Sequence, residues 1–246
     1  MNKFQIESRR ILPFYYIVVS LAGLGLLSVL VFHSEVSIMD SQFRKQLATT
    51  VFILICLLGI LAGKFPSTCL NMIDIKGSRK TSSYSSSEIS SIKEKVRYVG
   101  HHPVCGNFSS HTISFGKNVY CGGCTGLILG AIISVIGSLI YVLFELNLGG
   151  VSQLLFWTGF IWVILGLIQH SIRNLGGVVV HLLLNVLFVV GAFFLLVAID
   201  VITESFVLEL YLFGLIFYWI FARTKLSQLE HGKICATCGI KNCTIA

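Results

Sequence analysis

Six long apolar runs constrain the fold of this 246-residue chain more than any other feature of its sequence. About 20 apolar residues in a helix cross the roughly 30 Å hydrocarbon core of a bilayer, and the runs are close to that length. Lipid offers backbone amides no hydrogen-bond partner, so each run is expected to be helical. The predicted spans are 11–32, 47–63, 125–144, 151–168, 176–199 and 205–222. The sequence therefore predicts an all-α fold, a polytopic membrane helical bundle with six transmembrane helices.

The composition excludes an ordinary soluble domain. Hydrophobic residues make up 55% of the chain and charged residues only 12%, whereas soluble domains carry about 25% charged residues. The lipid bilayer is therefore the first predicted partner.

The distribution of basic residues predicts the orientation. The net charge is +7, and all of the 18 lysines and arginines except Arg44 and Lys45 fall at the N-terminus, in the second or fourth connection, or in the tail. By the positive-inside rule, both termini and the second connection face the cytoplasm. The excess charge is then a topology signal, so we expect a multi-pass protein of the cell (inner or plasma) membrane and no nucleic-acid partner.

Composition changes along the chain predict four segments. Residues 1–64 form a transmembrane helical hairpin, and 65–99 form a cytoplasmic serine-rich linker with a short amphipathic helix. Residues 100–222 form a Cys/His loop with a four-helix membrane core, and 223–246 form a cytoplasmic Cys/His tail. The short helix is indicated by the capping pattern Ser85-x-x-Glu88 and the apolar residues that follow it. It is expected either on the inner leaflet or on the protein's own cytoplasmic face.

The Cys/His loop has the ligand spacing of a metal site. Cys121-Gly-Gly-Cys124 is a C-x-x-C turn, which lets two thiolates bind one tetrahedral ion. A third cysteine and three histidines lie in the same segment, and cytoplasmic thiols are usually reduced. The thiolates are expected from Cys105, Cys121 and Cys124, and a fourth ligand from His101, His102 or His111.

Two other interpretations of this loop remain open. The histidines could be solvated surface residues beside small apolar cysteines. Alternatively, the C-x-x-C pair ahead of a helix could be a redox pair, because a helix N-terminus stabilises a thiolate.

The tail repeats this chemistry. Its cysteines and histidine either close a second site or join Cys121 and Cys124 in a four-thiolate site; we favour two separate sites. Zinc is the expected cofactor, with an iron-sulfur cluster as the alternative. The tail ligands are His231, Cys235, Cys238 and Cys243.

Polar residues gather at the same predicted membrane depth as the loop. They predict a polar pocket at the inner mouth of the bundle, because ionisable residues inside a membrane are commonly functional. The alternative is a simple interhelical hydrogen bond by His181 and Asn185. The predicted pocket consists of Gln169, His170, Arg173, His181 and Asn185.

The opposite face of the membrane is expected to be acidic. Asp200 and Glu204 belong to the outer surface, and only Glu209 is predicted at lipid depth, where it would pair or reach the surface. Arg44 is expected in the first outer connection, residues 33–46.

The loop also resembles a known family. Tyr120-Cys121-x-x-Cys124-Thr125-Gly126 with Gly130, preceded by His101-His102-Pro103-x-Cys105, is similar to the membrane domain known as DUF2085, and Gly166-x-x-Gln169 resembles its second patch. The resemblance covers about residues 100–200. It departs at Gly123, where the family pattern has arginine, and at Leu165, where it has an acidic residue. It implies a membrane fold and no mechanism, since the family is a domain of unknown function.

These features favour a structural, sensing or assembly role for a membrane protein with cytoplasmic zinc-type sites and a protein partner at its cytoplasmic face. The alternatives are a metal- or iron-sulfur-dependent membrane oxidoreductase that uses His170 and His181, or a transporter of a small solute or metal. The sequence identifies no catalytic residue.

Overall fold

The computed structural model describes the main part of every predicted membrane span. The described residues are 3–33, 41–64, 98–99, 102–103, 112–115, 118–144, 146, 148–169 and 177–237. Their side chains are described for 11–33, 42–64, 112–113, 120–144, 146, 148–169 and 177–229.

Six helices in this part of the chain are long and apolar enough to cross a membrane, which confirms the predicted number of spans. A short 3-10 turn, η2 (Gly149–Val151), precedes the fourth of them. The helices are α1 (Lys3–His33), α2 (Ser41–Lys64), α4 (Gly122–Leu143), α5 (Ser152–Ile168), α6 (Gly177–Thr203) and α7 (Phe206–Thr237).

Several helix ends extend beyond the predicted spans, and three of these extensions bear on the site. Helix α2 begins six residues before 47, α4 begins three residues before 125, and α7 continues beyond 222 to Thr237. Backbone hydrogen bonding does not stop where hydrophobicity stops, so a helix can continue into polar sequence. As a result Arg44, Cys124 and Arg223 lie inside helices.

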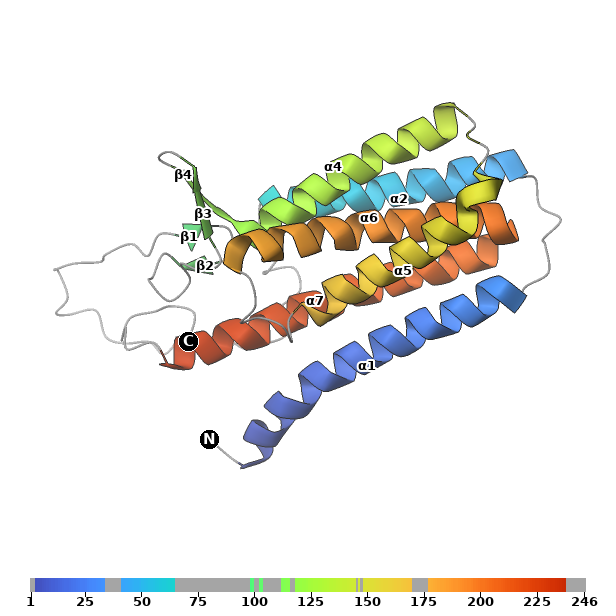
Figure 1. Cartoon of the computed structure of the whole chain (residues 1–246). Coiled ribbons are helices and arrows are strands. Elements are labelled where there is room, and N and C mark those ends of the chain that lie inside the picture. Colours follow the sequence, from blue (N-terminus) through green and yellow to red (C-terminus); the bar gives the residue numbers. More distant parts are fainter. Residues whose placement is uncertain are drawn as a thin grey trace, which may run out of the picture.

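Consecutive long helices run in opposite directions (Figure 1). The start of α1, the end of α7 and the short strands lie at one end of the bundle, which we call the strand end. The end of α1, the start of α2, the end of α6 and the start of α7 lie at the opposite end. This arrangement agrees with an even number of spans.

Four short strands lie at the strand end and were not predicted. β1 (Tyr98–Val99) pairs antiparallel with β2 (His102–Pro103), and β3 (Thr112–Phe115) pairs antiparallel with β4 (Asn118–Cys121). β1 was expected as the end of the short amphipathic helix, whose other residues lie outside the described part of the chain. Aromatic and β-branched residues such as Tyr98 and Val99 favour extended backbone, which opposes a helix there.

Helix α6 is the centre of the bundle. It packs mainly against α4 and α5, and it is the most buried of the six helices. Helix α2 packs on α4, and α1 packs on α7. The two helices of the expected N-terminal hairpin therefore each lie mainly against a later helix.

Glycines let α6 approach its neighbours closely. A methyl group at Gly159 of α5 would lie 2.6 Å from the Gly191 carbonyl oxygen, and one at Gly191 would lie 2.9 Å from the Gly159 carbonyl oxygen. A methyl group at Gly130 of α4 would likewise lie 3.0 Å from the Val186 carbonyl oxygen. Small residues at such contacts are typical of helix packing in membranes, where backbones must approach each other.

We therefore expect Gly191→Ala to destabilise the protein by about 1–3 kcal/mol, because the new methyl group would push α5 away from α6. Gly25→Ala is the matched control, since no atom of another described residue lies within 4 Å of the methyl group it would add. Thermal unfolding in detergent measures both variants. Equal unfolding temperatures for the two variants would show that the α5–α6 contact is not tight.

Candidate functional site

The C-x-x-C turn joins a strand to a helix. Cys121 is the last residue of β4 and the N-cap of α4, and Cys124 lies in the first turn of that helix. The side chain of Cys121 is buried, that of Cys124 is half-buried, and the two thiols lie within hydrogen-bonding reach of each other. The positive end of a helix favours negative charge on nearby groups. The turn therefore presents two adjacent sulfur atoms at the start of a helix.

The strands place other parts of the predicted site near this turn. Thr112, which follows His111 in the sequence, pairs with Cys121 in the β3–β4 register. His102 belongs to β2, whose partner β1 contacts β4. The backbone around His102 thus belongs to the same small strand assembly as Cys121.

Most of the other predicted ligands lie outside the described residues. This applies to His101, Cys105, His111, Cys238 and Cys243, while His231 and Cys235 belong to α7 beyond the described side chains. In the part of the chain with described side chains, no group of three or more His, Cys, Asp or Glu residues is placed to hold a metal ion. The complete zinc site stays a prediction.

A polar cluster lies beside the turn and contains a residue that the sequence did not predict there. We call it the Arg223 cluster: Gln169 at the end of α5, His181 and Asn185 of α6, and Arg223 of α7. Gln169 Nε2 lies 2.7 Å from His181 Nδ1, and Asn185 Nδ2 donates to the His181 carbonyl at 2.5 Å. Three of the five predicted pocket residues are thus together; His170 and Arg173 lie outside the described residues.

Arg223 of α7 forms hydrogen bonds with residues of α5 and α6 and so connects three helices. Its guanidinium donates to the Gly166 carbonyl at 3.0 Å, to Gln169 Oε1 at 3.3 Å and to Asn185 Oδ1, and it lies 4.4 Å from the centroid of the Phe188 ring. Within the described residues all of these partners are neutral. The cluster therefore keeps a net positive charge.

Asn185 connects this cluster to the thiols. A methyl group at Gly123 would lie 3.7 Å from Asn185 Nδ2 and 3.9 Å from Cys121 Sγ. The amide that binds Arg223 therefore lies next to the C-x-x-C turn. The positive charge of Arg223 and the two sulfur atoms belong to one neighbourhood at the strand end.

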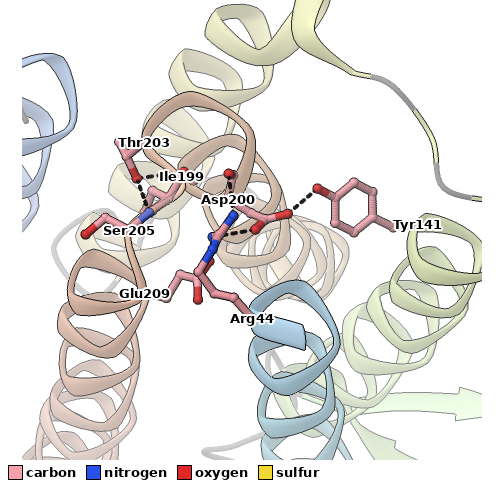
Figure 2. A network of polar contacts seen from close by, with 7 residues as sticks. All are labelled: Arg44, Tyr141, Ile199, Asp200, Thr203, Ser205 and Glu209. Carbon is pink, nitrogen blue, oxygen red and sulfur yellow. Dashed lines mark hydrogen bonds and ion pairs between the residues drawn. The ribbon is translucent and has the colours of Figure 1, made fainter. Parts of the chain in front are cut away.

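A second polar cluster lies at the opposite end and corrects the predicted placement of its members. We call it the Arg44 cluster: Arg44 of α2, Tyr141 of α4, Asp200 of α6 and Glu209 of α7 (Figure 2). Arg44 Nη1 lies 2.6 Å from Asp200 Oδ1 and also bonds Glu209, and Tyr141 donates to Asp200 Oδ2. Arg44 was expected in a loop and Asp200 on the outer surface, but both are buried.

One sequence signal pointed to this second cluster. Glu209 lies in an apolar run, and a carboxyl group at lipid depth needs a partner. Its partner could not be named from spacing, because Arg44 is separated from Glu209 by most of the chain.

Comparison with known proteins adds no identification: no family model, curated protein or solved structure matches the chain. The resemblance to DUF2085 stays a prediction.

We expect Arg223→Met to lower the free energy of unfolding by about 1–3 kcal/mol, because it leaves buried acceptors on Gly166, Gln169 and Asn185 without a donor. Lys225→Met is the matched control on the same helix, since among the described residues Lys225 makes only a 3.4 Å contact to Gln228 and a distant contact with the Phe221 ring. Denaturant unfolding in detergent compares the two. A loss no larger for Arg223→Met than for Lys225→Met would contradict the role assigned to Arg223.

Proposed function

We propose that this multi-pass membrane protein holds zinc at the strand end of its bundle and has a structural, sensing or assembly role there. The observation that carries the proposal is the contact between the Cys121 and Cys124 thiols at the start of α4. Two adjacent sulfur atoms from a C-x-x-C turn are half of a tetrahedral zinc site. Cys105 and one histidine of the loop are proposed to complete it.

The surroundings of the thiols support zinc in a second way. A site of three thiolates and one imidazole around Zn²⁺ has a net charge of about −1, and such a charge requires compensation near a membrane. Arg223 supplies a positive charge in the same neighbourhood through Asn185. We further propose that this end faces the cytoplasm, since most basic residues lie, in sequence, before the apolar part of α1, between α2 and α4, between α5 and α6, or after the apolar part of α7.

A thiol-based membrane oxidoreductase is the second candidate. The same contact between Cys121 and Cys124 favours it, because adjacent thiols can form a disulfide by giving up two electrons and two protons to an oxidant. The buried position of Cys121 favours metal binding over redox exchange, because exchange needs an accessible sulfur.

Metal analysis separates the two candidates. Protein purified without oxygen is expected to contain about one zinc ion per chain for each complete site, and Cys121→Ala should remove the zinc bound at the loop. Cys56→Ala is the matched control, because Cys56 is a buried cysteine of α2. Loss of folded protein in Cys121→Ala alone would agree with zinc, since metal-binding energy contributes to folding.

A truncation after Leu229 tests the tail in the same assay and should lower the zinc content without abolishing it. Metal-free protein with a Cys121–Cys124 disulfide by mass spectrometry would contradict the zinc proposal and favour the oxidoreductase. A brown protein with bound iron would favour an iron-sulfur cluster.

The orientation can be tested separately with peptide tags. A tag after Ala246 is expected to be cleaved by added protease only in inside-out vesicles, because the strand end is proposed to be cytoplasmic. A tag inserted between residues 34 and 40 should be cleaved only in right-side-out vesicles. The reverse pattern would contradict the orientation, and cleavage of both tags on one side would contradict the six-span topology.

A further inference from the structure

The Arg44 cluster contains more negative than positive charge. Arg44, Asp200 and Glu209 are 2%, 6% and 0% exposed, and the bundle packs apolar side chains around them. If every group were ionised, two carboxylates would share one guanidinium. An unbalanced charge in such surroundings is costly, so a further positive charge is required.

Neighbouring groups do not supply this charge. Tyr141 of α4 is neutral and donates to Asp200 Oδ2 (Figure 2). Lys45 of α2 is half-buried and lies 3.8 Å from the centroid of the Tyr141 ring. In the part of the chain that the structure describes, it forms no ion pair with Asp200 or Glu209.

Helix ends do not explain the cluster either. Arg44 lies in the first turn of α2 and Asp200 in the last turn of α6, where the helix dipole disfavours the charge that each carries. Only Glu209, in the first turn of α7, has a favourable position. The charged groups are therefore stabilised mainly by their interactions with one another.

The carboxyl groups themselves point to the missing charge. Asp200 Oδ1 and Glu209 Oε1 both contact the same nitrogen atom, Arg44 Nη1, so the two carboxyl groups lie close together. Glu209 Oε2 is buried and has no hydrogen-bond partner among the described residues. Two ionised carboxylates are both acceptors and cannot bond each other, whereas one protonated carboxyl can donate to the other.

We propose that Asp200 and Glu209 share one proton, which makes the Arg44 cluster a proton-binding site at the end of the bundle opposite the thiols. A carboxyl pair that shares a proton is the arrangement expected when like charges cannot both ionise at close range. With the proton bound, one positive and one negative charge remain, and Glu209 Oε2 gains a partner.

The free oxygen count favours a proton over a metal cation. Asp200 Oδ2 accepts from Tyr141 and Glu209 Oε1 accepts from Arg44, while Asp200 Oδ1 lies 2.6 Å from Arg44 Nη1 without a hydrogen bond among the described residues. A hard cation such as Mg²⁺ or Ca²⁺ needs about six or more oxygen ligands. The two carboxyl oxygens without a hydrogen bond, Asp200 Oδ1 and Glu209 Oε2, are too few for such an ion and are sufficient for one shared proton.

Proton binding would couple charge to helix packing. The cluster joins the terminal turns of α2, α4, α6 and α7. Removing the proton leaves two carboxylates around one guanidinium, and their repulsion acts directly on the contact between α6 and α7. The site therefore makes the packing of α7 depend on proton binding.

Infrared spectroscopy of the full chain in lipid nanodiscs tests this proposal. The wild type is expected to show the C=O stretch of a protonated carboxylic acid at neutral pH, where exposed carboxyl groups are ionised. Glu209→Gln and Asp200→Asn should each remove this band, because each leaves a single carboxylate paired with Arg44. Glu204→Gln is the matched control, from the α6–α7 connection, and should retain it.

A wild-type spectrum without the band would overturn the proposal before any variant is made, so a variant that fails to fold does not remove the test. Absence of the band at neutral pH would overturn the proposal, as would a band that persists in both cluster variants. If the band is absent and the unfolding temperature rises with added sodium but not with choline, the site binds a sodium ion and not a proton.

Discussion

Close packing of α6 between α4 and α5 is the contact on which the rest of this bundle depends. An apolar helix gains little free energy when it leaves lipid to contact another helix. Helix association therefore depends on close packing and on hydrogen bonds between helices. Glycines provide the close contacts. Polar ties are added near both ends of α6, at Asn185 and Asp200, which are roughly 22 Å apart at 1.5 Å per residue. The central helix is thus fixed at two depths.

The number of helices could be predicted from sequence, but their polar ends could not. An apolar run of membrane length is a strong signal, because lipid excludes irregular backbone. Polar turns that extend a helix beyond its apolar run give no such signal, so Arg44 and Arg223 were placed outside the spans. The β3–β4 hairpin did leave a trace in the sequence. Thr112–Phe115 alternates polar and apolar side chains, and Gly116-Lys117, which separates it from Asn118–Cys121, is a two-residue connection with the leading glycine typical of hairpins.

The two polar clusters were predictable to different degrees. His181 and Asn185 are four residues apart in a helix, and a short connection separates Gln169 from them, so local spacing was sufficient to group the three. Arg223 joins them from a helix distant in sequence, and Arg44 meets Asp200 in the same way. Neither pairing follows from periodicity, which says which face a residue occupies and not which helix lies against that face.

The clusters also differ in the sign of their unbalanced charge, and this difference links them to different partners. Among the described residues Arg223 bonds only neutral groups, so its positive charge is uncompensated and lies near two sulfur atoms at the strand end. In the Arg44 cluster two carboxylates share one guanidinium, so one negative charge is uncompensated when every group is ionised. An anionic thiolate site suits the first and a proton suits the second, because each would neutralise the charge that the protein leaves uncompensated. The two proposed sites therefore rest on the same electrostatic requirement, applied at opposite ends of one helix.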